Sequence, residues 1–258
     1  GDGSQSVSAA GDANLYALDD IHLDHVTAGG DVRLGSDADA DVEALSAGGD
    51  IELLFARQGL SGAYAAGGDV QHAEVHGGAT DLDLSADRIE ELTVRGDLLG
   101  AALQAACIDT VTVRGCIDDG AAGTVIVATS DLGRLYAYGD LDADIHAGLD
   151  DYDNPWGVPH IGAVVAWGDL SGTFVLYDDD IDEVRAGGAD TAVVQNEGGD
   201  PVTPDIRIDH DYTVFGFYPG DGPYTWYVAG EAAPWSLQRA AGLIGEARQA
   251  FAEAVRQI

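Results

Sequence analysis

Aspartate is the residue that recurs in this sequence at a spacing suited to chemistry. It follows glycine in a segment that recurs every nineteen residues, as "TAGGDVRL" from Thr27, "SAGGDIEL" from Ser46 and "AAGGDVQH" from Ala65. Weaker copies extend the column to Asp12, Asp31, Asp50, Asp69, Asp97, Cys116, Asp140, Asp169 and Ala189. Copies stacked about 4.8 Å apart would repel by about 1 kcal/mol per neighbouring pair even in water. We therefore expect each Asp to accept hydrogen bonds from corner amides, with bridging cations as the alternative.

A second set of oxygen ligands lies in the segment "GLDDYDNPWGVPH", which runs from Gly148 to His160. Hard carboxylate and amide oxygens suit Ca²⁺. The candidate calcium ligands are Asp150, Asp151, Asp153 and Asn154. Trp156 is a candidate for stacking on a sugar ring. The alternative is a solvated loop with Trp156 folded onto the protein, and a further acidic run at 177–183 favours a solvated edge.

Other kinds of active site find little support in the residues. His72 and His76 share one segment, but no third residue has the spacing of a zinc ligand. The chain contains no Gly-x-Ser-x-Gly, phosphate-binding loop or Cys-x-x-Cys. Paired carboxylates could hydrolyse glycosides, but stacked aspartates supply such pairs everywhere. We therefore name no catalytic or cofactor-binding residue, and calcium is the one cofactor that the sequence suggests.

Composition narrows the possible partners. The chain has 258 residues, 46 acidic side chains and 11 basic ones, all of them Arg, which gives a net charge of −35. Phosphate binding requires clusters of Lys and Arg, so we expect no nucleic-acid partner. No apolar run is long enough to span a membrane, and we expect no membrane insertion. Cations or a saline medium suit this charge better, although an acidic surface can serve solubility alone.

The nineteen-residue interval has a structural explanation. Around each Asp, apolar residues fall five and three positions before it and one after it, a period of two that indicates a strand with one buried face. One such strand cannot bury its face alone, so the copies must stack as a solenoid of about nine coils. We expect the longer intervals of 28, 24 and 29 residues to be coils with loops at 70–88, 118–130 and 147–160.

Three further expectations concern side chains of the solenoid. The aliphatic residues five positions before the Asp should form one internal stack, which contains Val26, Leu45, Leu92, Val111, Leu135 and Val164. Tyr64 occupies the same column, and its hydroxyl needs a partner if it is buried. Cys107 and Cys116 flank an extended strand, which would hold their Cα atoms beyond the ~7 Å limit for a disulfide.

The segments "TAGGDVRL" and "SAGGDIEL" resemble the repeats of filamentous-haemagglutinin-type secreted adhesins, and "LTVRGDL" and "VTVRGCI" resemble repeats of large acidic bacterial surface proteins. The resemblance covers about residues 7–189. It implies an all-β fold, a right-handed parallel β-helix. A left-handed helix fits less well, because it favours strict hexapeptides and a period of eighteen.

The end of the chain keeps none of the repeat. We expect a repeat domain over 1–189, an aromatic β-hairpin over 190–233 and an amphipathic capping α-helix over 234–258. The hairpin is suggested by seven aromatic residues around a Pro-Gly-Asp-Gly-Pro turn. It would plug the open end of the solenoid or serve as a ligand platform. The helix would pack on the acidic solenoid or its cap, with a short coiled coil as the alternative.

These features favour a non-catalytic structural or adhesive module of a secreted or cell-surface protein, with an extracellular or cell-surface location. The expected partners are other copies or neighbouring repeats of a larger surface assembly, with carbohydrate as a further candidate. One alternative is a glycan-cleaving β-helix enzyme, which should gather its long loops and aromatics on one wall around a groove. Another is a phage or viral fibre segment, which would need to trimerise.

Overall fold

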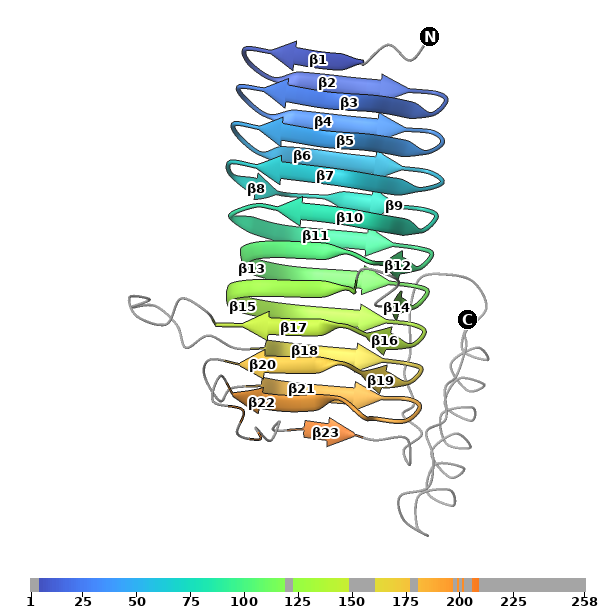
Figure 1. The fold of residues 1–258 in the computed structure, drawn as a ribbon, viewed down its shortest axis with the longest axis vertical. Helices are drawn as coiled ribbons and strands as arrows, with labels where there is room; N and C mark the ends of the chain where they lie inside the picture. The colour runs from blue at the N-terminus through green and yellow to red at the C-terminus, as the bar shows by residue number, and fades with distance from the viewer. Residues whose placement is uncertain are drawn as a thin grey trace, which may run out of the picture. The chain divides into compact units, whose positions relative to one another are not determined.

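A computed structural model describes residues 5–118, 123–148, 161–176, 181–196, 199, 201 and 206–208. These residues form an all-β parallel solenoid of about nine turns, with no helix among them. Figure 1 shows the coils following one another along the stack, each pairing with the coil before and the coil after. The prediction of a parallel β-helix is thus confirmed at the level of the solenoid.

Each coil has two walls, which we call the first wall and the second wall. The first wall contains β1 (Ser6–Ala9), β3 (Ile21–Ala28), β5 (Ala40–Ala47), β7 (Leu60–Ala66), β10 (Ala79–Ser85), β17 (Asp144–Ala147), β20 (Thr173–Leu176) and β22 (Val193–Asn196). The second wall contains β2 (Ala13–Ala17), β4 (Val32–Ser36), β6 (Ile51–Ala56), β9 (Ala73–Val75), β11 (Arg88–Val94), β18 (Ile161–Ala166), β21 (Ile181–Ala186) and β23 (Ile206–Ile208).

The remaining strands complete the coils. Two long strands, β13 (Ala102–Val113) and β15 (Val125–Ala137), belong to both walls, because their first halves pair with the first wall and their second halves with the second. Short strands lie where a wall begins: β8 (Asp69–Val70), β12 (Leu98–Leu99), β14 (Ile117–Asp118), β16 (Leu141–Asp142) and β19 (Leu170–Ser171). The chain turns from the first wall to the second at the first corner, and from the second wall to the next coil at the second corner.

The aliphatic column forms two internal stacks, and the expectation of a single stack was wrong. Val26 pairs with Leu45 on the first wall, and that row continues to Tyr64 and then Leu84. Leu92, Val111, Leu135 and Val164 pair in succession on the second wall. All six predicted residues are buried. The two rows face each other across one aliphatic core, which is why both show the same pattern.

The 28-residue interval between Asp69 and Asp97 marks the place where the repeat motif moves from one wall to the other. Asp69 pairs with Arg88, nineteen residues later, so residues 70–88 form an ordinary coil that contains β9 and β10. The expected loop there was wrong. The Gly-Asp segment moves from the first corner, where it ends at Asp69, to the second corner, where it resumes at Asp97. The excess of nine residues over nineteen is about half a coil.

The other two insertions can be located by register. Leu99 pairs with Asp118 and Ala102 with Val125, so extra residues enter between β14 and β15, in a narrower place than the predicted 118–130. A bulge in β15 between Ala128 and Asp131 adds to that interval. The third insertion separates Ala147, the end of β17, from Ile161, the start of β18, as expected.

Two predictions about side chains are confirmed. Tyr64 is 1% exposed, and its hydroxyl donates to the backbone carbonyl of Ser61 at 2.9 Å. Burial raises the pKa of this phenol well above its ordinary value, and the negative charge of Asp41 adds to the increase. Cys107 and Cys116 are both free.

Parallel pairing continues past residue 189, because β22 pairs with β20, and β23 pairs with β21. Residues 208–258 form a separate unit by their contacts. Of the expected aromatic β-hairpin over 190–233, only residues 190–196, 199, 201 and 206–208 are described, and its aromatic segment and the expected capping helix over 234–258 lie outside the described residues.

Candidate functional site

The aspartates of the repeat hold neighbouring coils together. At the first corner, Oδ1 of Asp31 accepts a hydrogen bond from the backbone N–H of Asp50 at 2.9 Å, and Asp50 accepts from the N–H of Asp69 at 2.9 Å. At the second corner, Asp97 accepts from the N–H of Cys116 and Asp140 from that of Asp169, both at 2.8 Å. The corner role expected from the sequence is therefore confirmed for these carboxylates.

The glycine before each Asp leaves room for the carboxylate of the preceding coil. A Cβ atom at Gly49 would lie 2.2 Å from Oδ1 of Asp31, and one at Gly115 would lie 2.0 Å from Oδ1 of Asp97. At Gly11, in the first coil, nothing lies within 4 Å. Gly-Asp is therefore one structural unit, in which the Gly of one coil accommodates the Asp of the coil before.

Most of the predicted ligand residues lie outside the described part of the chain. These are Asp150, Asp151, Asp153 and Asn154 of the calcium set, and Trp156. Among the residues that are described, no group of three or more His, Cys, Asp or Glu side chains is arranged to hold a metal ion. In the second acidic run, Glu183 is described and forms an ion pair with Arg185.

The outer side of the second wall and the corners next to it carry the arginines and the exposed aromatic side chains among the described residues. Within the described ranges, arginine occurs on this wall and the corners next to it, and the first wall carries none. One outward row crosses successive coils through Tyr16, Gly35, Phe55, Glu74, Thr93, Thr112, Tyr136, Val165 and Arg185. The row at the second corner contains Asp37, Arg57, His76, Arg95, Arg114, Tyr138 and Trp167.

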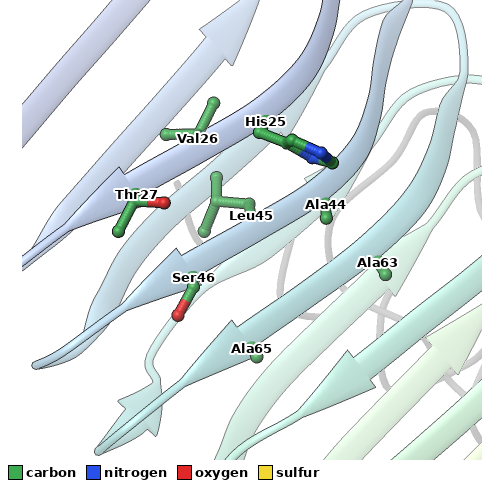
Figure 2. Close-up of a pocket in the computed structure, with 8 residues that line it drawn as sticks. All are labelled: His25, Val26, Thr27, Ala44, Leu45, Ser46, Ala63 and Ala65. Carbon is green, nitrogen blue, oxygen red and sulfur yellow. The ribbon is translucent and has the colours of Figure 1, made fainter. Parts of the chain in front are cut away.

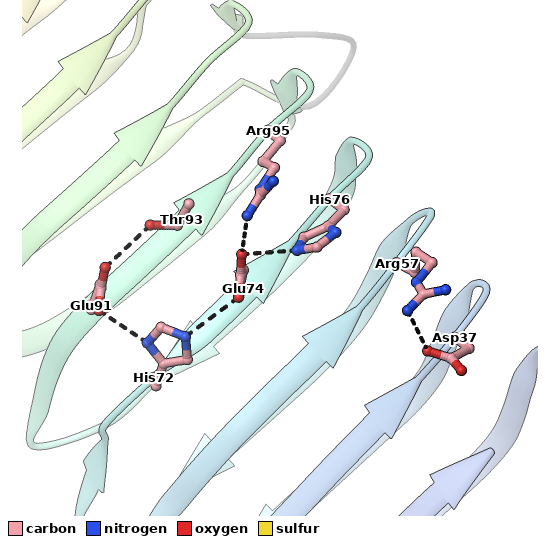
Figure 3. Close-up of polar contacts among 8 residues, drawn as sticks. All are labelled: Asp37, Arg57, His72, Glu74, His76, Glu91, Thr93 and Arg95. Atoms are coloured by element: carbon pink, nitrogen blue, oxygen red, sulfur yellow. Dashed lines mark hydrogen bonds and ion pairs between the residues drawn. The ribbon is translucent and has the colours of Figure 1, made fainter. Parts of the chain in front are cut away.

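A polar cluster occupies the middle coils of this wall (Figure 3). Glu74 accepts from Arg95 at 2.8 Å and lies 2.8 Å from Nε2 of His76, while His72 lies 3.0 Å from Glu91. Burial alone would raise the pKa of Glu74, but the hydrogen bonds from Arg95 and His76 outweigh it and lower that pKa. The two histidines thus point to carboxylates, which gives a surface ion network.

Aromatic residues gather on the later coils of the same wall. The rings of Tyr138 and Trp167 stack with their centroids 4.5 Å apart and their planes 8° from parallel. Tyr136 meets Trp167 edge to face at 6.3 Å. All three side chains are partly exposed. We call Arg134, Tyr136, Tyr138 and Trp167 the aromatic–arginine platform.

Arg134 differs from the other arginines of the wall. The side chains of Arg33, Arg57, Arg88, Arg95 and Arg185 each form an ion pair with an acid. Arg134 is exposed and, within the part of the chain that the structure describes, has no ion pair or hydrogen bond from its side chain. A free guanidinium among so many carboxylates is a distinctive feature of the platform.

The two walls also carry shallow grooves. On the first wall, His25, Thr27, Ala44, Ser46 and Ala65 line an open groove of about 250 Å³ (Figure 2). On the second wall, a groove of about 200 Å³ lies over Tyr16, Gly35 and Phe55. The first-wall groove exists because its outward residues are small. Apart from His25, none of them carries a titratable side chain.

Sequence reasoning missed the platform because it followed the Asp column. A signal was present: the residues at 57, 76, 95 and 114 are Arg, His, Arg and Arg at exact nineteen-residue spacing. Such spacing places them in one outward row. That Arg134 is free could not be found this way, because it depends on which acids lie on the neighbouring coils.

No helix among the described residues is long and apolar enough to cross a membrane. No protein-family model, no curated protein and no solved structure matches the chain.

Proposed function

We propose that this chain is a non-catalytic structural and adhesive module of a secreted or cell-surface protein, similar in role to filamentous-haemagglutinin-type adhesins. The solenoid, wound right-handed, serves as the rigid part, and the aromatic–arginine platform on its later coils serves as the contact surface. The observation that carries the proposal is that acidic and basic side chains of the repeat have different partners. The Gly-Asp carboxylates bind the next coil, whereas the second wall displays arginine and aromatic side chains outward.

Rigidity is supported by how each coil is held. Every turn of the described solenoid buries aliphatic side chains in one continuous core and pairs with its neighbours through parallel strands. Carboxylate-to-amide hydrogen bonds reinforce both corners. Because hydrogen bonds to charged groups are stronger than neutral ones, the corners resist separation of the coils.

The acidic surface is consistent with an extracellular setting, where screening by salt reduces self-repulsion between like charges. Neighbouring repeats or other copies, held in a larger surface assembly, remain the partners we propose along the solenoid axis. Calcium at Asp150, Asp151 and Asp153 also remains part of the proposal, since oxygen-rich segments suit that ion.

The alternative of a glycan-cleaving enzyme is favoured by one observation: the exposed aromatics share one wall. The inserted segments that such an enzyme would use as loops leave the solenoid at other places than these aromatics. The insertion after β17 leaves the solenoid at the first corner, whereas Tyr138 and Trp167 lie at the second. The segment inserted after β14 leaves at a third place in the coil. An enzyme groove would need these segments and the aromatics to border one cleft.

The test is adhesion measured together with turnover. The full chain is immobilised on a microbalance sensor and challenged with neutral, acidic and sulfated polysaccharides, and each solution is then assayed for new reducing ends. We expect retention of at least one polysaccharide with no increase in reducing ends. Release of reducing ends would establish the enzyme alternative, and retention of none would contradict the adhesive part of the proposal.

A further inference from the structure

We propose that the aromatic–arginine platform binds an acidic polysaccharide in which carboxylated sugars alternate with uncharged ones. This inference rests on the proposed adhesive function and names the ligand class of that surface. Arg134, Tyr136 and Tyr138 belong to one coil, and Trp167 belongs to the next. Arg134 and Tyr136 therefore lie on the sheet of the second wall, and Tyr138 and Trp167 stack at the second corner that follows it.

The charge of the ligand follows from Arg134. The protein has a net charge of −35, and the other described arginines whose ion pairs are given above are already neutralised by acids. Arg134 is exposed and has no such partner in the part of the chain that the structure describes. A guanidinium matches a carboxylate with two parallel hydrogen bonds. One free cation suits one carboxylate at a time, whereas a nucleic acid presents a dense row of phosphates that needs several cations.

The aromatic rings supply the second part of the recognition. Tyr138 and Trp167 are stacked on each other, and the next position along their row is Gly187, which has no side chain to cover the far face of Trp167. An uncharged sugar ring has an apolar C–H face that can stack on such a ring, with its hydroxyls directed to the side. Thr110 and Thr112, which pair with Arg134 and Tyr136 from the preceding coil, offer hydroxyl groups on the guanidinium side of the platform.

The shape of the surface favours a chain over a small molecule. Among the residues that the structure describes, the platform residues line neither of the two grooves described above. Small ligands are usually enclosed on most sides, whereas an extended polymer can lie along a flat sheet and contact several rows. Alternation of charged and uncharged sugars then allows a carboxylate at Arg134 and a neutral ring at Trp167.

The probe is hyaluronan, compared with hyaluronan whose carboxyl groups have been reduced to alcohols, with the full chain in titration calorimetry. We expect binding of hyaluronan that weakens with added NaCl and is weaker still for the reduced polymer. Arg134→Gln and Trp167→Ala should each weaken binding by at least about tenfold, as loss of central binding residues does. Arg134→Lys should retain part of the affinity, because it keeps the charge and loses the paired hydrogen bonds.

Matched controls are available on the same wall. Tyr16→Ala removes an exposed aromatic from the same outward row as Tyr136, and Arg33→Gln removes an exposed arginine that already has an acid partner. Both should leave binding unchanged. Because Trp167 is partly buried, unfolding of Trp167→Ala is checked by circular dichroism; Arg134→Gln changes an exposed, unpaired side chain and keeps the test decisive.

Each of the following outcomes would overturn the inference. Equal binding of the native and carboxyl-reduced polymers would remove the role of the carboxylate. Equal loss in the control variants would place the site elsewhere, and binding of single-stranded DNA through the same residues would show recognition of anions without sugars. If hyaluronan does not bind while another polysaccharide is retained on the sensor, this inference fails and the adhesive proposal stands; retention of none overturns both.

Discussion

The Gly-Asp corners and the outer side of the second wall both place charged residues at nineteen-residue spacing, but they use the charge differently. At the corners, Asp31 and Asp50 direct their carboxylates along the stack to the backbone of the next coil. On the wall, Arg134 directs its guanidinium to solvent, and Glu74, on an earlier coil, joins a surface network. The same repeat length therefore supports both cohesion between coils and display toward a partner.

This difference teaches that periodicity alone does not separate structural from functional residues. A repeated Asp is explained when each carboxylate has an amide donor one coil away and a glycine makes space for it. A repeated Arg is explained when an acid of a neighbouring coil binds it, as Asp109 binds Arg88. The residues left over after both accounts, Arg134 first among them, are candidates for contact with other molecules.

We expect the largest loss of stability from a substitution that overcrowds a corner. Gly49→Ala would place a methyl group against the carboxylate of Asp31, and we expect a loss of roughly 2–3 kcal/mol, as overpacked sites show. Gly11→Ala is the matched control, because the same motif position in the first coil is open. Urea denaturation followed by tryptophan fluorescence compares them. Equal midpoints for the two variants would show that the glycine does not make room for the carboxylate.

Removing a corner carboxylate should have the next largest effect. Asp50 accepts from the backbone N–H of Asp69 and from the side-chain amide of Gln71, both at 2.9 Å. We expect Asp50→Ala to cost about 1–2 kcal/mol, because both donors lose their partner. Asp83→Ala, at an exposed first-wall position, removes the same charge and should change stability little. Similar losses in both variants would point to charge in general rather than to the corner.

On the wall, the stabilising effect of Glu74 should depend on pH. Its folded-state pKa lies below the ordinary value of 4.5, so its contribution is present above that value and disappears as pH falls through the folded pKa. The difference in melting temperature between wild type and Glu74→Gln should therefore be constant near neutral pH and shrink in acid. A difference that grows as pH falls would contradict the ion network with Arg95.

The smallest expected effect is a gain in stability when the corner position of residue 116 is given the Asp that neighbouring coils have. Cys116 stands where neighbouring coils have Asp, and a Cβ at Gly139 would lie 2.6 Å from its sulfur, so the side chain occupies the carboxylate position. Cys116→Asp should add a hydrogen bond to the N–H of Asp140 and stabilise by about 0.5 kcal/mol. The melting temperature is measured in high salt, which screens the added charge. A decrease there would show that the corner does not accept the carboxylate.

Much of the fold could be predicted from the sequence because the repeat dictates it. The apolar residues five and three positions before each Asp predict a half-buried strand, and the nineteen-residue interval predicts the perimeter of a coil. The half-coil shift between Asp69 and Asp97 could not be found by aligning on the motif, since either corner accepts the same Gly-Asp unit. The platform escaped prediction for a different reason: whether Arg134 is paired or free depends on side chains of other coils.

The central claim is that corners provide stability and the platform provides binding, and one paired measurement tests it. Asp50→Ala and Arg134→Gln are each assayed for the urea midpoint and, under conditions where both are folded, for retention of hyaluronan on the sensor. We expect Asp50→Ala to lower the midpoint and keep retention, and Arg134→Gln to keep the midpoint and lose retention. If both variants lower the midpoint and neither changes retention, the proposed division between corners and platform is wrong.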